Sequence, residues 1–172
     1  MGVGSSAKRL GQESGWVKVN SDATIDSRNN LATGGSVFRD ITGQVLKVEV
    51  QIFEGISEAE TETAELLALR FRVKLATDLG FDKVHFESDA SLAIHRVNGS
   101  SNAIDHTQLI AEDIVSIGNR LESTKFSHVR RSGNRLAHAI ASWGLHHRSN
   151  LVSDNVVAAE MQSIVMTYIM LQ

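Results

Sequence analysis

The period of the hydrophobic pattern changes about one third of the way along the chain, and this change constrains the fold more than any other feature. Apolar and polar residues alternate over 16–22, 32–40 and 45–53, which is typical of half-buried strands. Short turn-forming segments separate the three stretches, so we expect an antiparallel meander. The second stretch contains Gly34 and Gly35, and paired glycines within a strand indicate a bulge or a close approach of another backbone.

Beyond this meander, the pattern alternates between helix and strand. Helices are predicted at 57–79, 90–97, 105–121 and 134–146, and strands at 83–88 and 124–129. Strands that alternate with helices pair in parallel through crossover connections. The sequence therefore predicts an α/β fold, with one mixed five-stranded sheet in which three antiparallel strands are followed by parallel additions, flanked by helices.

The chain has 172 residues, a length that suits one domain with a hydrophobic core. We expect a flexible leader over 1–15, the folded domain over 16–147 and, over 148–172, a C-terminal tail or short extra helix. The absence of cysteine excludes a disulfide partner and any thiolate metal site. No apolar run reaches the roughly 18–20 residues of a membrane helix, so no membrane partner is expected. We expect a monomer.

The net charge of −3 excludes a chain that is basic throughout, as many nucleic-acid-binding proteins are. The charge is unevenly distributed, because residues 123–153 contain five Lys and Arg and no Asp or Glu. Such a segment forms either a local phosphate-binding patch or a solvated helix face. Composition alone leaves both interpretations open.

Three acidic residues occupy positions where a site could form. Asp22 ends the first predicted strand and Asp89 follows the fourth, both in phase with the polar side, while Glu65 interrupts an apolar helical segment. Taken alone, Asp22 could be an ordinary turn residue, Asp89 the N-cap of the next helix and Glu65 a solvated acid on a helix surface. Sites in open α/β sheets form beyond the carboxyl ends of strands. Three carboxylates that converge there repel one another unless a divalent cation such as Mg²⁺ neutralises them.

Five segments carry a resemblance to a known family. They are residues 19–23 (VNSDA), 34–40 (GGSVFRD), 63–69 (TAELLAL), 87–90 (ESDA) and 128–141 (HVRRSGNRLAHAIA). In this order and spacing they resemble the ribonuclease H family, and most of all its plant-type, reverse-transcriptase-associated subgroup, which occurs alone and in retroelement polyproteins. The resemblance covers roughly residues 16–146.

The resemblance implies a function and a set of site residues. Asp22, Glu65 and Asp89 would be the catalytic carboxylates that bind the metal. The partner and substrate would be an RNA–DNA hybrid, of which the RNA strand is cut to leave a 5′-phosphate and a 3′-hydroxyl. Up to two ions, Mg²⁺ or Mn²⁺, would flank the scissile phosphate, one activating a water and one stabilising the leaving oxygen.

One position departs from the family pattern. Many members carry a fourth acid in the last helix, four residues after the asparagine that matches Asn134, and here that residue is His138. An imidazole brings one nitrogen and no negative charge, so His138 as a catalytic residue would hold a second ion less tightly and favour Mn²⁺ over Mg²⁺. In the other interpretation His138 is an ordinary polar helix residue and the second metal site is lost. Both imply reduced activity.

Residues of the basic segment are the expected nucleic-acid contacts: His128, Arg130, Arg131, Asn134 and Arg135. Arginine binds phosphate through two parallel hydrogen bonds. His128 lies where some family members place a mobile histidine that helps product release, although it also fits a strand residue with a satisfied imidazole. Some bacterial members insert a basic helix where this chain has only residues 99–104, so we expect weak hybrid binding that depends strongly on salt.

Three functions are compatible with these features. The first is a hybrid-specific endonuclease, supported by the intact set of three acids. The second is a catalytically weak or inactive nucleic-acid-binding or interaction module, possible for a retroelement-derived chain and supported by His138, the missing basic helix and the acidic net charge. The third, another nuclease chemistry on the same fold, is favoured least by the motifs.

Overall fold

The computed structural model describes residues 15–153 and 159–169. The elements in chain order are β1 (Val17–Asp26), β2 (Leu31–Arg39), β3 (Val45–Glu54), η1 (Glu58–Glu60), α1 (Thr61–Asp78), β4 (Lys83–Ser88), α2 (Ser91–Val97), α3 (His106–Gly118), β5 (Ser123–His128), η2 (Arg131–Gly133), α4 (Arg135–His147), β6 (Leu151–Ser153) and α5 (Ala159–Ile169). Most of the predicted leader, residues 1–14, lies outside the described residues.

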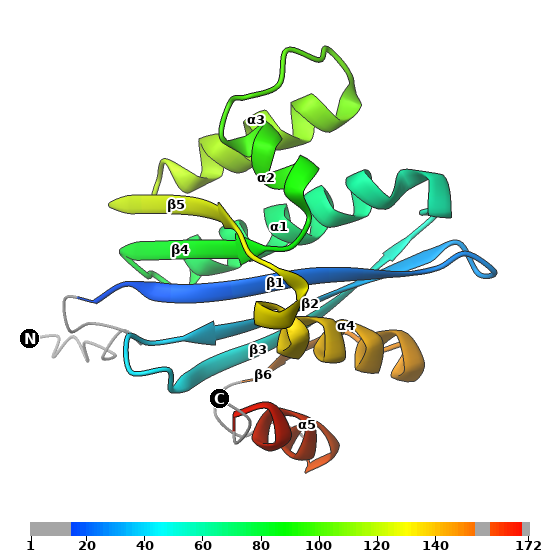
Figure 1. Cartoon of the computed structure of the whole chain (residues 1–172), viewed down its shortest axis with the longest axis vertical. Helices are drawn as coiled ribbons and strands as arrows, with labels where there is room; N and C mark the ends of the chain where they lie inside the picture. The colour runs from blue at the N-terminus through cyan, green and yellow to red at the C-terminus, as the bar shows by residue number, and fades with distance from the viewer. Residues whose placement is uncertain (1–14, 154–158, 170–172) are drawn as a thin grey trace, which may run out of the picture.

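The strands form one mixed sheet in the order β5-β4-β1-β2-β3-β6 (Figure 1). β1, β2 and β3 pair antiparallel, while β4 and β5 are added in parallel on the free side of β1. The predicted fold class is thereby confirmed, including the change from a meander to parallel additions. The change follows from the connections between strands. Two tight turns join the first three strands, which favours antiparallel pairing, and helices make the later connections, as parallel pairing requires.

The expected count of five strands is wrong, because β6 adds a sixth. This strand pairs antiparallel with β3, with Val48 opposite Ser153 and Val50 opposite Leu151. Three residues are too few to show a period of two, and the pairing depends on a distant strand, so the sequence carried no signal for it. The segment predicted as a tail or an extra helix thus contains both a strand and, at α5, a helix.

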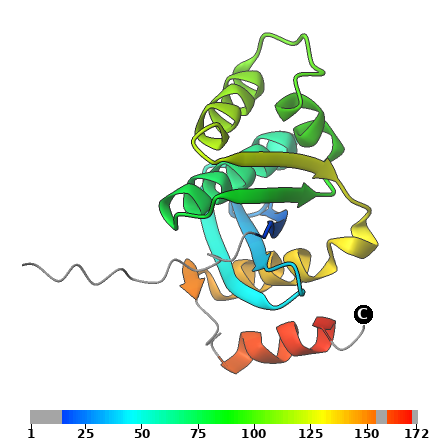
Figure 2. The ribbon, with the colours of Figure 1, turned by 90° about the vertical axis from the view of Figure 1, so that its left-hand side faces the viewer.

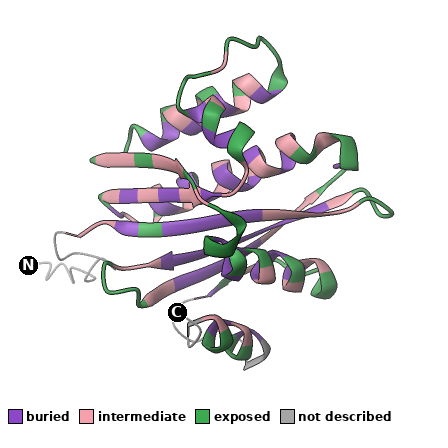
Figure 3. Ribbon diagram, viewed as in Figure 1, coloured by how far each residue is buried: buried purple, intermediate pink, exposed green. Residues whose placement is uncertain are grey.

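Helices cover both faces of the sheet (Figures 1 and 2). On one face α1, α2 and α3 enclose a core that includes Phe38, Leu66 and Phe86. On the other, α4 and α5 pack over β2 and β3 around Val37 and Ile140. Neighbouring residues of β2 therefore belong to different cores, and Figure 3 shows the buried stretch in the middle of the sheet. None of the helices that the structure describes is long and apolar enough to cross a membrane.

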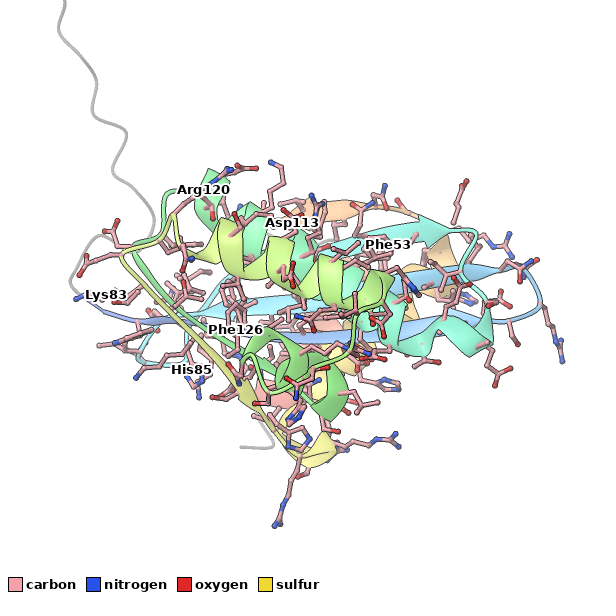
Figure 4. The ribbon with its side chains drawn as sticks, turned by 90° about the horizontal axis from the view of Figure 1, so that it is seen from above. Phe53, Lys83, His85, Asp113, Arg120 and Phe126 are labelled. Atoms are coloured by element: carbon pink, nitrogen blue, oxygen red, sulfur yellow. The ribbon has the colours of Figure 1, made fainter. Side chains whose placement is uncertain are left out.

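Several ion pairs connect α1 to the elements around it. Arg70 pairs with Asp113 on the outside of α3, which Figure 4 shows lying across the sheet. Arg72 and Glu49 form a fully buried pair between α1 and β3, with Arg72 Nε 3.1 Å from Glu49 Oε2. The Ser36 hydroxyl donates to the same carboxylate oxygen at 2.8 Å. Burial raises the pKa of Glu49 and lowers that of Arg72, and their mutual attraction opposes both changes.

The glycine pair of β2 marks a close approach of other atoms, as one of the two sequence interpretations predicted. A Cβ atom on Gly35 would lie 2.3 Å from the Ala141 nitrogen and 2.7 Å from the Ala137 oxygen, both in the main chain of α4. A Cβ on Gly34 would lie 2.5 Å from a guanidinium nitrogen of Arg72. The irregularity of β2 lies elsewhere, next to its last residue. The two glycines thus admit a helix on one face and a buried arginine on the other.

We predict that Gly35→Ala destabilises the protein by roughly 1–3 kcal/mol or more, because α4 has to move away from the sheet. Urea unfolding measures the change. Gly133→Ala is the matched control, since the nearest atom to its new Cβ would be Val129 Cβ at 4.0 Å. Equal unfolding free energies for the two variants would show that α4 does not depend on this contact.

Candidate functional site

The parallel register of β1 and β4 brings two of the predicted acids together. Ser21 pairs with Ser88 at the last position of that register, so the next residues, Asp22 and Asp89, come close enough to influence each other's charge. We expected Asp22 to end the first strand, and this boundary is wrong, because antiparallel pairing with β2 carries β1 on to Asp26. Only the parallel pairing ends here, after Ser21, so the sheet opens at Asp22.

Glu65 extends from α1 toward these two acids. Its Oε2 atom is buried and has no hydrogen-bond partner among the described residues. Burial, followed by the negative charges of Asp22 and Asp89, raises the pKa of the Glu65 carboxyl to about 8. Burial also raises the pKa of Asp22 to about 6, although its hydrogen bond with His138 acts in the opposite direction. Three carboxylates therefore share a space that holds too little positive charge to keep all of them ionised.

His138 lies beside this acid cluster. Its Nδ1 atom is 2.7 Å from Asp22 Oδ2, while 66% of its side chain remains exposed. The backbone N–H of His138 donates to the Asn134 carbonyl, as is normal in the first turn of a helix. The imidazole is therefore attached to a buried carboxylate at one edge and open to solvent elsewhere.

Asn134, which we expected among the nucleic-acid contacts, is only 2% exposed. Its Nδ2 atom donates to the Ser21 carbonyl and to Asp89 Oδ1, each at 2.8 Å. These two bonds connect the start of α4 to β1 and hold the Asp89 carboxylate in one orientation. The geometry is that of a residue that positions an acid, and it leaves no free N–H for a phosphate.

The basic residues divide into two groups. Arg131 and Arg135 are exposed and line the same cavity as the acids, and Arg131 Nε lies 3.7 Å from Asp89 Oδ2. Arg130 and His128 are also exposed but do not line it, and His128 is the last residue of β5. The structure thus brings two of the four predicted surface contacts to the acids.

A cavity of about 710 Å³ unites these side chains. Of the predicted residues it is lined by Asp22, Glu65, Asp89, Arg131, Asn134, Arg135 and His138. The cavity also contains Tyr168, which reaches it from α5, and Ser91 at the start of α2, neither of which was predicted from the sequence. Tyr168 lies in the segment predicted as a tail or extra helix, and no local pattern connects such a segment to a site.

The chemistry of this donor set suits a divalent cation. Carboxylate oxygens are the ligands that Mg²⁺ and Mn²⁺ prefer, and Glu65 Oε2 is buried without a partner. In residues 15–153 and 159–169, however, no three His, Cys, Asp or Glu side chains are arranged as a metal site. Asp22 and Asp89 instead direct one oxygen each to His138 and Asn134. The Asp22 and Asp89 carboxyl groups nevertheless lie within hydrogen-bonding reach of each other.

Comparisons with known proteins agree on the fold. A family model described as reverse transcriptase-like matches residues 20–144. Among solved structures, a ribonuclease H1 from the archaeon Halobacterium salinarum is 21% identical and superposes with a TM-score of 0.70 over 77% of this chain and 99% of its own. The N-terminal ribonuclease H domain of a Mycobacterium tuberculosis protein is 18% identical and superposes with a TM-score of 0.69 over 78% of this chain and 96% of its own. No curated protein matches the chain.

A third solved structure contains a nucleic acid. It is a ribonuclease H1 isolated from compost, in complex with an RNA/DNA hybrid. It is 17% identical to this chain, with a TM-score of 0.61 over 77% of this chain and 98% of its own. Identities in this range establish a shared fold and say nothing of individual site residues.

We predict that the metal-free protein loses stability between about pH 5 and pH 8. Asp22 and Glu65 have pKa values of about 6 and 8 in place of 3.8 and 4.5, so the folded state binds their protons more tightly. Stability is complete below the unfolded values and falls as pH rises through the folded ones. Glu65→Gln should therefore raise the unfolding free energy at pH 8 by on the order of 1–3 kcal/mol.

Urea unfolding with EDTA at both pH values measures this effect. The comparison of wild type with Glu65→Gln isolates Glu65 from other groups that titrate in this range, and Glu58→Gln, on an exposed residue of η1, is the matched control. The same stability difference between wild type and Glu65→Gln at pH 5 and pH 8 would contradict the prediction.

Proposed function

Because the chain belongs to the reverse transcriptase-like family and contains a ribonuclease H-like domain, we propose that it is a divalent-metal-dependent endonuclease that cleaves the RNA strand of RNA–DNA hybrids. One observation carries the proposal: Asp22, Glu65 and Asp89 line a single cavity together with two arginines. Buried acids without a countercharge are expensive for a fold, and sites that bind cations are where such arrangements occur.

The proposed roles follow from the contacts. Arg131 and Arg135 are exposed at the cavity, where they can bind the backbone phosphates of a hybrid strand. Asn134 holds Asp89 in its orientation, and Glu65 offers a buried oxygen without a partner. A bound divalent cation would supply charge neutralisation at the scissile phosphate and a more acidic water. Arg130 and His128, outside the cavity, would contact the strand further from the reacting phosphate.

His138 has a distinct part in this proposal. Its hydrogen bond to Asp22 supports a place next to the metal-binding acids. There it orients the Asp22 carboxylate, and its exposed ring is available as a nitrogen ligand for a second ion. An imidazole without negative charge binds Mg²⁺ poorly and suits Mn²⁺ better, so we propose an enzyme whose activity in Mg²⁺ is reduced.

A second candidate function is nucleic-acid binding without efficient cleavage. The observation that favours it is the lack, in the described part of the chain, of any three side chains arranged as a metal site. If the hydrogen bonds of Asp22 and Asp89 persist when substrate binds, the arginines still contact phosphates while the acids stay inactive. Binding would then be salt-sensitive, with no dependence of product formation on the three acids.

We predict that purified protein cleaves the RNA strand of a labelled hybrid in Mn²⁺ and more slowly in Mg²⁺, and that Asp89→Asn lowers the rate at least about 100-fold. Asp82→Asn is the matched control, because Asp82 is an exposed acid at the opposite end of β4. Gel analysis of the labelled RNA gives the rates. Binding of the hybrid with no cleavage in either metal would establish the second candidate in place of the first.

We predict further that His138→Asp raises the cleavage rate in Mg²⁺ roughly 10-fold, since it restores a fourth carboxylate at the cavity. The rate in Mn²⁺ should change less. His146→Asp places the same charge on an exposed residue near the end of α4 and controls for charge alone. Unchanged or lower Mg²⁺ activity in His138→Asp would mean that His138 does not act at the metal.

A further inference from the structure

One wall of the cavity comes from the C-terminal part of the chain, beyond the segment that the family model matches. Helix α5 contributes Tyr168 to it. Met161 and Val165 of the same helix are buried in the core shared with α4, and Tyr168 packs at the edge of that core. Figure 2 shows α5 in red, running beside α4. The position of the Tyr168 ring is therefore fixed by packing.

The ring is close to one of the two arginines of the site. The guanidinium carbon of Arg135 lies 5.5 Å from the centroid of the Tyr168 ring, a distance at which a cation and an aromatic face attract each other. Arg135 is exposed and remains available to a phosphate. The guanidinium lies over the ring, so the same wall presents an aromatic ring and a phosphate-binding group in contact.

This combination matches the chemistry of an unpaired nucleotide. Unpaired bases stack on aromatic rings and on guanidinium planes, whereas neighbours cover both faces of a base inside a duplex. A cavity of about 710 Å³ has the size of sites that enclose small ligands. A cavity of this size can accept one nucleotide.

We infer that Tyr168 binds an unpaired nucleobase of the substrate, next to a phosphate held by Arg135. The inference rests on the proposed function and adds a preference to it: a hybrid with a single-stranded extension beside the duplex binds more tightly than a blunt hybrid. It also makes α5 part of the substrate-binding surface. A phosphate contact alone would give no preference for an extension with bases over an abasic one, because both offer the same backbone.

The test uses the full chain with Asp89→Asn, so that substrates stay intact in Mg²⁺, and measures binding by fluorescence anisotropy. Three hybrids are compared: blunt, extended by a few nucleotides, and extended by abasic nucleotides. The extension should tighten binding about 5-fold or more, which is the scale of one stacked base. The abasic extension, which keeps the phosphates and lacks the bases, should lose this gain relative to the normal extension, and the comparison requires no change to the protein.

Variants then assign the effect to the ring. Tyr168→Leu keeps an apolar side chain against the core and should lose the preference for the normal extension over the abasic one. Tyr168→Phe should retain it. Met166→Ala, on an exposed residue of the same helix, is the matched control. Equal binding of abasic and normal extensions, or an unchanged preference in Tyr168→Leu, would overturn the inference. Failure of the parent to bind any hybrid would instead refute the proposed function.

Discussion

The contact between the main chain of α4 and Gly35 is the constraint on which the site depends. Gly35 lies opposite Asp22 in the pairing of β1 with β2, and the Ala137 carbonyl occupies the space that a side chain at Gly35 would need. His138 follows directly, so the close approach of the helix brings the imidazole within hydrogen-bonding distance of Asp22. The same approach sets the start of α4, where Arg135 lies at the cavity wall.

Charge is unbalanced beneath the cavity, and the imbalance extends into the core. Arg72 is fully buried, and the negative charges of Glu49, Glu65 and Asp22 all favour its charged form. The buried Arg72 guanidinium is therefore close to several acids, and Glu49 is its direct ion-pair partner. The pKa values of Asp22 and Glu65 stay raised, so this arginine does not offset the cost of burying them. A fold retains such a cost where a ligand of opposite charge compensates it.

The parts of the molecule that could be predicted from sequence are those with local signals. The strand Lys83–Ser88 and the acid after it follow from an alternating pattern and its end, and the ordered motifs indicated which acids meet. Pairings between distant segments had no such signal. The Arg72–Glu49 pair joins α1 to β3, and neither residue is marked by a local pattern. The strand β6 has only three residues, too few to show an alternating pattern. Tyr168 reaches the site only because α5 packs beside α4.

The short strand β6 also has a consequence for the outer edge of the sheet. It covers β3 at Val48–Val50, and the Asn150 side chain accepts a hydrogen bond from the Ile52 N–H at 2.7 Å. An uncovered edge offers a row of free N–H and C=O groups to any other extended chain, and proteins shield such edges to avoid aggregation. Asn150 and β6 thus shield the edge of β3. A fragment that ends with α4 would leave this edge open to pairing with a strand of another molecule.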